Sequence, residues 1–391
     1  MTGKTHLWPE EPVRSGGAVT AGVVVEGPQH DRVRIWYRVP ERYGGLITAS
    51  GDPYVLVMLF TAMRIPTDLH MHGEVSPSLL RNLDEFQAAW ACWRPERYVK
   101  VEITADAERE HPCAGGPGSA VTLFSGGVDS SFTAYRYRNG LCGRQNLDLE
   151  AGLMIHGFDI PLESAGAFHR AAERAEGMVK SLGIEFISMA TNLRDLGEPW
   201  WDMHGAAPAS CLSLLQRGFA AGIIPSTEPY NGLVLPWGSN PVTDWMLSGD
   251  SFRIIHDGAS FSRVEKVGVI AEWKEALQHL RVCMIGKEDE EDRNCNVCEK
   301  CIRTILNFRV LGLALPGCFE HDASDSQIAG LRGLDALKIA ELQRVLTYAK
   351  RRSLTASWVR ALQVCLVRNQ LRLKLRKTAR KLRNTIPFLA P

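Results

Sequence analysis

The spacing of apolar residues in the first third of the chain predicts a mixture of strands and helices. Residues 32–39 alternate between polar and apolar side chains, which is typical of a half-buried strand. Residues 52–60 are apolar and β-rich at first, and residues 98–103 alternate again. Between them, residues 79–93 have apolar side chains at helical spacing. We therefore expect residues 1–115 to form an α+β module.

The middle of the chain alternates short apolar strands with amphipathic helices. A Gly- and Pro-rich linker, 111–120, leads into predicted strands at 121–124, 152–156 and 184–189, with a helix at 164–182 before the last strand. Strands that alternate with helices imply a parallel sheet with helices on both faces. We expect a doubly wound α/β domain over 116–280.

After the strands the pattern becomes helical. A cysteine-rich lobe is expected over 281–310, and a helical extension over 311–391. The whole chain has 391 residues, 45% of them hydrophobic, and a net charge of +1, which is typical of an ordinary globular protein. It has no apolar run of about 18 residues and no signal-peptide core, so we expect no membrane span and a cytoplasmic location. In that reducing compartment its ten cysteines are not expected to form a disulfide framework.

One loop stands out between the strand at 121–124 and the helix that begins near Phe132. It reads Ser-Gly-Gly-Val-Asp-Ser-Ser over 125–131. Adjacent glycines let a backbone turn sharply and approach a ligand closely, and N–H groups at a helix start favour an anion. A bridging Mg²⁺ would explain Asp129 beside phosphate groups. The plainer alternative is a Gly-rich turn with a helix cap.

This loop resembles the PP-loop of the ATP pyrophosphatases, also called adenine nucleotide alpha hydrolases. The resemblance implies a sheet of the PP-loop (HUP) type and cleavage of ATP between its α- and β-phosphates. It also implies that the loop residues hold ATP and Mg²⁺, and that the strand ending at His156-Gly157 lines the adenine site. The residues assigned to the pyrophosphate are Ser125, Gly126, Gly127, Asp129 and Ser130, and Ser131 is expected to bind ATP with them.

Four of the cysteines cluster near one another in the sequence. Cys283, Cys295, Cys298 and Cys301 have the spacing C-x11-C-x2-C-x2-C. Four thiolates can surround a tetrahedral Zn²⁺ ion with no open coordination position, which indicates a structural site. An iron–sulfur cluster is the sharper alternative, because it also takes four cysteines. Chance, or singly buried cysteines, is the plainer one.

A PP-loop followed by this cysteine spacing is similar to 7-cyano-7-deazaguanine synthase (QueC). In the synthase family the cysteines bind zinc, and a G-x-N-x-x-D stretch helps to form the substrate pocket. Gly238, Asn240 and Asp244 align with that stretch after a one-residue shift. The resemblance covers about 121–304, so the flanking segments indicate a QueC-like paralogue from defence or specialised metabolism.

Further candidates lie between the loop and the cysteines. His256 and Asp257 follow a short strand, where His256 could act as a base or hydrogen-bond donor; a simple turn is the alternative. Arg263 and Lys266 share one face of a helix start and could bind phosphate or a carboxylate, or form a solvated face. Cys211 could be a nucleophile or a core residue.

Two tryptophans and the C-terminus complete the candidates. Trp200 and Trp201 could stack on a planar heterocycle or pack as a loop. Thirteen Lys and Arg residues and no Asp or Glu follow Glu341. This basic tail could bind RNA, an acidic partner or an anionic surface, or dock on the acidic run 288–292 of its own chain. A homodimer is one assembly to test.

The function we expect is ATP-dependent adenylation of a carboxyl or carbonyl oxygen, with release of pyrophosphate and attack by a nitrogen nucleophile. The substrate carboxylate belongs to a small molecule or to a protein. We expect Asp129, His256, Arg263 and Lys266 to carry the catalysis. Two alternatives remain: a PP-loop sulfurtransferase that acts on RNA, and a non-catalytic nucleotide-sensing scaffold.

Overall fold

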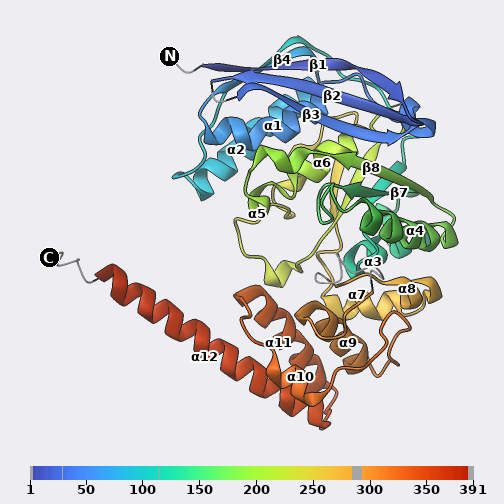
Figure 1. Cartoon of the computed structure of the whole chain (residues 1–391), viewed down its shortest axis with the longest axis vertical. Coiled ribbons are helices and arrows are strands. Elements are labelled where there is room, and N and C mark those ends of the chain that lie inside the picture. Colours follow the sequence, from blue (N-terminus) through green and yellow to red (C-terminus); the bar gives the residue numbers. More distant parts are fainter. Residues whose placement is uncertain (1–2, 29, 114, 284–292, 386–391) are drawn as a thin grey trace. The chain divides into compact units, whose positions relative to one another are not determined.

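The first part of the chain builds a single ten-stranded sheet, flanked by helices (Figure 1). This computed structural model describes residues 3–28, 30–113, 115–283 and 293–385. The chain divides into two units, Met1–Ser260 and Phe261–Pro391, and each is described by itself. The predicted α/β class is confirmed, and the sheet is mostly, though not wholly, parallel.

Five strands form the parallel half of the sheet, in the order β8-β7-β6-β9-β10. Since β7 lies on one side of β6 and β9 on the other, the direction of the connections reverses at β6. In open α/β sheets, ligands bind outside the carboxyl ends of the strands at such a reversal. The bounds are β6 (Ser119–Leu123), β7 (Asp148–His156), β8 (Glu185–Thr191), β9 (Ala221–Pro225) and β10 (Arg253–Asp257).

Helices connect these strands and cover the sheet. The helix α3 (Val128–Arg138) follows β6, α4 (Ala165–Ser181) joins β7 to β8, and α6 (Ala206–Ser213) precedes β9. The predicted strands at 121–124, 152–156 and 184–189 and the helix at 164–182 are confirmed within a few residues.

The other half of the sheet comes from the N-terminal segment. Strands β1 (Lys4–Ser15), β2 (Ala18–Gly27) and β3 (His30–Pro40) are antiparallel, while β4 (Asp68–Val75) and β5 (Ile103–Glu108) add to β1 in parallel. The helices α1 (Asp52–Arg64) and α2 (Pro77–Trp93) lie against these strands (Figure 1). An antiparallel contact between β3 and β8 joins the two halves, so the N-terminal strands continue the parallel sheet.

Two predicted strands of the N-terminal segment are wrong. Residues 52–60 are helical, in α1, and nearly every side chain of that helix is buried. A helix that is buried on all sides has no polar face, so its sequence cannot be distinguished from a buried strand by periodicity. Residues 98–102 are not a strand, because Tyr98 packs its ring on Phe60 and Trp90 before β5 begins at Ile103.

The second unit is built of helices, as predicted beyond Cys301. The helix α12 packs against α10 and α11, and α9 packs against α7 and α11. No helix in the described ranges is both long enough and apolar enough to cross a membrane. The bounds are α7 (Arg263–Ile270), α8 (Lys274–His279), α9 (Glu299–Leu311), α10 (Asp325–Gly330), α11 (Ala336–Arg351) and α12 (Ser357–Thr385).

The acidic run and part of the basic C-terminal tail lie outside the residues that the structure describes. The acidic run 288–292 lies outside the described residues, and so do the side chains of Lys377, Arg380, Lys381 and Arg383. Docking of the basic tail on that run therefore stays a prediction, as does binding of RNA or an acidic partner.

A buried pair of hydroxyls connects the N-terminal strands to the parallel half. The side chain of Ser210, in α6, donates to the Pro53 carbonyl oxygen at 2.7 Å. Its oxygen lies 2.5 Å from the hydroxyl of Tyr37, in β3. Because the Ser210 proton is used at Pro53, Tyr37 is the donor in this second bond. Tyr37 and Ser210 are both fully buried.

This chain of donors makes the two single substitutions unequal. Tyr37→Phe removes a donor but leaves Ser210 bonded to Pro53, and we expect a loss of about 1 kcal/mol of unfolding free energy. Ser210→Ala leaves the buried Tyr37 hydroxyl without its acceptor, and we expect a loss of about 2–3 kcal/mol. Urea unfolding of both variants measures the difference; equal losses would contradict this order of donors.

Candidate functional site

The loop 125–131 begins where β6 ends, at the reversal point of the sheet. Gly126 has a φ of +73°, a conformation that glycine adopts without strain. The Ser130 hydroxyl accepts from the Ser125 N–H at 3.2 Å and donates to the Gly127 carbonyl oxygen at 3.2 Å. Ser130 lies in the first turn of α3, which begins at Val128 and not near Phe132 as predicted, so these bonds tie that turn to the residues that follow β6.

The first turn of α3 has backbone N–H groups that no side chain caps. Gly127 is the N-cap residue and has no side chain to cap the first N–H groups of the helix. Asp129 lies in this first turn. The Ser131 hydroxyl is buried and makes no hydrogen bond to another described residue. An uncapped helix start of this kind could hold an anionic ligand, and binding of ATP and Mg²⁺ here stays a prediction.

At the carboxyl end of β7, His156 and Gly157 have structural contacts that fix the path of the chain. His156 donates from Nε2 to the Pro161 carbonyl oxygen at 2.9 Å and stacks on Phe168. Burial lowers the pKa of His156, so the ring is held neutral. Gly157 has a φ of +102°, and a Cβ there would lie 2.0 Å from the Thr191 carbonyl oxygen. Only glycine fits this approach, and contact of these two residues with adenine stays a prediction.

An aspartate–histidine pair lies at the carboxyl end of β10. Asp244 is fully buried, and its carboxylate accepts from Ser239 Oγ at 2.7 Å and from the Asn240 N–H at 3.0 Å. The same carboxylate lies 2.8 Å from Nδ1 of His256. An ionised carboxylate only accepts, so Nδ1 of His256 carries the proton.

This proton assignment defines what His256 can do. Its Nε2 is an acceptor in the neutral ring, and it is buried with no hydrogen-bond partner among the described residues. A buried acceptor held by a carboxylate on the opposite ring nitrogen is the arrangement of a general base. His256 is therefore the better-placed member of the predicted pair 256–257.

Asp257 has a different role from the turn corner that was the plainer interpretation. It accepts from Thr133 Oγ1 at 2.7 Å and from Arg136 Nη2 at 2.8 Å, both on α3. Successive side chains of a strand point to opposite faces, so Asp257 binds the α3 side of the sheet and His256 points away from it. The buried Arg136–Asp257 pair fixes α3 against β10.

The loop 237–244 owes its shape to two of the predicted substrate-pocket residues. Asn240 uses both side-chain atoms internally: it donates to Trp237 and Thr243 and accepts from Val242 and Thr243. Gly238 approaches Gly205 so closely that a Cβ on Gly205 would lie 2.2 Å from the Gly238 carbonyl oxygen. These residues position the loop, and direct contact with a ligand stays a prediction.

Sequence reasoning missed two supports of this loop. His204 lies against Trp237, and its Nε2 accepts from the Ser239 N–H at 3.3 Å. Burial lowers the pKa of His204, which keeps the ring neutral. Ser239 holds Asp244 through its hydroxyl. The signal for Ser239 was its place within the Gly-Ser-Asn stretch, and the signal for His204 was its place at a predicted helix start.

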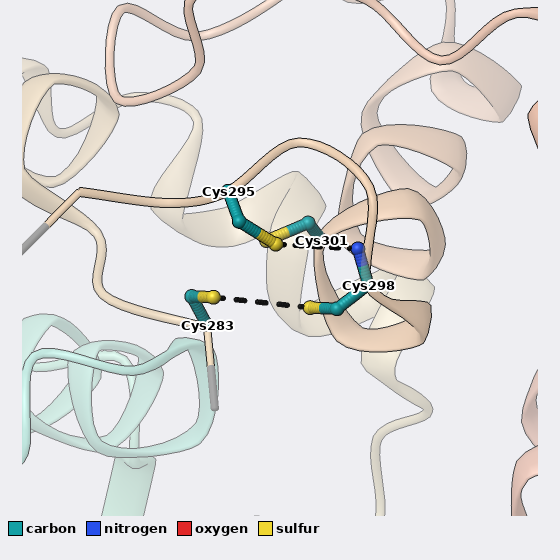
Figure 2. Close-up of side chains that lie close together, drawn as sticks. All are labelled: Cys283, Cys295, Cys298 and Cys301. Atoms are coloured by element: carbon teal, nitrogen blue, oxygen red, sulfur yellow. Dashed lines mark hydrogen bonds between the residues drawn. The ribbon is translucent and has the colours of Figure 1, made fainter. Parts of the chain in front are cut away.

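The four cysteines of the second unit converge on one point (Figure 2). One sulfur from each lies within 4.8 Å of the others. The pairs Cys283–Cys298 and Cys295–Cys301 are each 3.9 Å apart between sulfurs. Cys298 is the N-cap residue of α9, and Cys301 lies in its first turn.

These separations suit a single tetrahedral ion. With Zn–S bonds of about 2.3 Å, the sulfurs of a tetrahedral site lie about 3.8 Å apart. The contact with Cys298, burial and the other two sulfurs raise the pKa of Cys301, as expected when four thiols crowd together with no cation. The cluster could therefore hold zinc, with four protein ligands and no position left for a substrate.

Arg263 and Lys266 belong to the second unit and are not the solvated face considered above. The predicted helix start is confirmed, since Ser262 and Glu265 form a capping box at the beginning of α7. Arg263 lies 3.4 Å from the buried carboxylate of Glu341, which Arg303 also approaches at 3.5 Å. Lys266 is buried. A catalytic role for Arg263 and Lys266 stays a prediction.

The remaining candidates separate into core and surface. Cys211 is fully buried in α6, and burial raises the pKa of its thiol, which disfavours the nucleophilic thiolate. Trp200 packs on Phe158 and Arg194. Trp201 is 65% exposed, and its ring centroid lies 5.5 Å from that of Trp237. Trp201 is thus the more exposed of the two tryptophans, and stacking of either on a ligand stays a prediction.

Comparison with known proteins gives no assignment. No protein-family model, no curated protein and no solved structure matches this chain.

The cysteine site predicts a clear separation between two substitutions. Cys298→Ser removes one ligand, and we expect bound zinc to fall from about one ion per chain to a small fraction, because closed sites need all four ligands. Folding and metal binding are linked, so the second unit should also melt at a lower temperature. Elemental analysis and calorimetry measure both effects.

The matched control is Cys92→Ser, which changes an exposed cysteine of the first unit. It should keep zinc and melting behaviour. Iron and sulfide in the purified protein, in place of zinc, would instead identify an iron–sulfur cluster.

Proposed function

We propose that this protein is a PP-loop enzyme that adenylates a substrate carboxyl or carbonyl oxygen with ATP, releases pyrophosphate, and joins a nitrogen nucleophile to the activated carbon. The observation that carries the proposal is the placement of Ser-Gly-Gly-Val-Asp-Ser at the reversal point of the sheet, between β6 and the uncapped start of α3.

In this proposal the loop holds the pyrophosphate part of ATP. The N–H groups of the first turn of α3 and the hydroxyls of Ser125 and Ser131 donate to the phosphate oxygens, while Ser130 keeps its bond to Gly127. Asp129 binds Mg²⁺, which shields its own charge from the phosphates. The dipole of α3 favours the negative charge that grows on the leaving pyrophosphate.

The second step uses His256. The nitrogen nucleophile attacks the adenylated carbon, a C–N bond forms, and the C–O bond to AMP breaks with its electron pair on AMP. The proton of the attacking nitrogen passes to Nε2 of His256. Support for this role comes from the 2.8 Å contact between Nδ1 and Asp244, which leaves Nε2 as the acceptor. His256 lies two strands from β6, about 10 Å along the sheet.

The alternatives receive less support. A sulfurtransferase needs a reactive cysteine, and Cys211, the candidate for that role, is in the core. Zinc bound by the four cysteines would be structural, because no coordination position is left open. The nucleotide-sensing scaffold is distinguished from the enzyme by turnover.

The loop carries the first functional prediction. Asp129→Ala should lower release of AMP and pyrophosphate at least a hundredfold, because the Mg²⁺ anchor is lost. The control Asp250→Ala changes an exposed aspartate of the same unit and should keep full activity. The assay follows AMP against ADP for a panel of carboxylic acids and acidic peptides. Full pyrophosphate release by Asp129→Ala, or ADP as the product, would overturn the proposal; binding without turnover would favour the scaffold.

The aspartate–histidine pair carries the second. His256→Gln should slow amide formation about 10²–10⁴-fold, the usual contribution of a general base, while adenylation continues. Asp244→Asn should have a similar effect, since an amide can donate to Nδ1 and so favour the wrong tautomer. Pyrophosphate exchange measures the first step and product formation the second. Equal losses in both steps would remove His256 from the role of base.

A further inference from the structure

A cluster of histidines lies on the N-terminal half of the sheet, away from the loop 125–131. His6 on β1 is paired in register with His70 on β4, and His70 with Thr104 on β5. His72 and Asp106 follow two residues further along their strands, so that their side chains share the same face. The side chains next to these histidines along the strands are buried in the core on the opposite face: Leu7, Leu69 and Met71.

Three of these side chains converge on one point. Nε2 of His70 lies 3.0 Å from Oδ1 of Asp106, and Nδ1 of His72 lies 3.6 Å from the same oxygen. One ligand atom from each of the three residues lies within 4.8 Å of the others. With metal–ligand bonds of about 2.0–2.1 Å, ligand atoms of a tetrahedral zinc site lie about 3.3 Å apart, between the two measured distances.

The hydrogen bonds show which atoms of His70 are available. The Thr104 hydroxyl donates to the Leu69 carbonyl oxygen at 3.2 Å, so its oxygen can only accept from His70 Nδ1, which lies 2.9 Å away. Nδ1 of His70 therefore carries a proton. In the neutral ring, Nε2 then carries a lone pair, and this lone pair faces the carboxylate of Asp106. Two acceptors at 3.0 Å repel each other unless a proton or a metal cation lies between them.

His72 is held in the same way on its far side. Its Nε2 lies 2.9 Å from Nδ1 of His6, so Nδ1 is the atom turned toward Asp106. The indole of Trp8 stacks on the His72 ring, with the ring centroids 3.3 Å apart and the planes 5° from parallel. In metal sites the second nitrogen of each histidine ligand is bonded to an outer partner that fixes the ring. Thr104 serves His70 in this way, and His6 serves His72.

We propose that His70, His72 and Asp106 form a second metal site, which binds a divalent first-row transition ion such as Zn²⁺, Co²⁺ or Ni²⁺. Two imidazoles and one carboxylate suit these ions better than Mg²⁺ or Ca²⁺, which prefer oxygen ligands. The site has three protein ligands, and the Asp106 side chain is 53% exposed, so solvent completes the coordination. Its open position distinguishes it from the four-cysteine site.

The experiment loads the full-length protein with one equivalent of Zn²⁺ to fill the cysteine site and then titrates it with Co²⁺. Cobalt bound by histidine and carboxylate gives weak ligand-field bands without the intense sulfur-to-metal charge transfer of a thiolate site. We expect one Co²⁺ per chain with these bands, and calorimetry should give the same stoichiometry.

Variants assign the ligands. His72→Gln and Asp106→Asn should each weaken Co²⁺ binding at least a hundredfold, and the exposed Asp106 can be changed with little risk to folding. His6→Gln, which removes only an outer partner, should weaken it 10–100-fold. The control His169→Gln changes an exposed histidine of α4 and should leave binding unchanged.

Binding of Co²⁺ that is equally tight in wild type, His72→Gln and Asp106→Asn would overturn this site, and so would wild-type protein that takes up no second ion. The zinc site belongs to the second unit, so the folding of the variants is checked in the first unit, by circular dichroism and by its melting temperature, which should both match wild type. None of these outcomes depends on ATP turnover, so the test stands apart from the function proposed above.

Discussion

The reversal of strand connections at β6 is the constraint on which the candidate chemistry depends. Two neighbouring parallel strands can be joined only by a crossover connection. The connections in this sheet place β7 and β8 on one side of β6, and β9 and β10 on the other side. The carboxyl end of β6 is therefore the place where neighbouring connections diverge. The loop that fills this place must turn sharply into a helix, and Gly126 supplies the left-handed residue that the turn requires.

Side chains at the neighbouring strand ends then secure this arrangement. Arg136 and Thr133 of α3 bind Asp257 at the end of β10, which prevents the helix from shifting along the sheet. Breaking a buried ion pair leaves an uncompensated charge and costs about 3–5 kcal/mol. On the other face of the sheet, Asp244 binds Nδ1 of His256, so that Nε2 of His256 points away from Asp244. The same short strand thus contributes, in successive residues, a candidate base and a side chain that fixes α3.

The sequence predicted correctly those elements whose conformation depends on residues close together in the chain. The β6 strand, the glycine turn and α3 were predicted because each has its own pattern, and the four cysteines because their short spacing brings them together. It was uninformative where tertiary contacts decide. The helix α1 has no polar face to mark it, and the roles of Asp257 and His204 depend on partners more than 30 residues away.

The histidine cluster belongs to this second class. The spacing of His70 and His72 places both on one face of a strand, but His6 and Asp106 join them only through strand pairing. Their register is a property of the whole sheet, and no single stretch of the sequence contains it.

Because β3 pairs with β8, the loop 125–131 and the histidine cluster lie on the same sheet, at a separation set by the strand order. Six strand spacings separate β6 from β4, which is about 30 Å at 4.8 Å per spacing. No small molecule bridges that distance, so a metal held by the histidines and a nucleotide held by the loop would have separate reactants and separate solvent. What they would share is the hydrogen bonding of one sheet, which continues through the β3–β8 pairing.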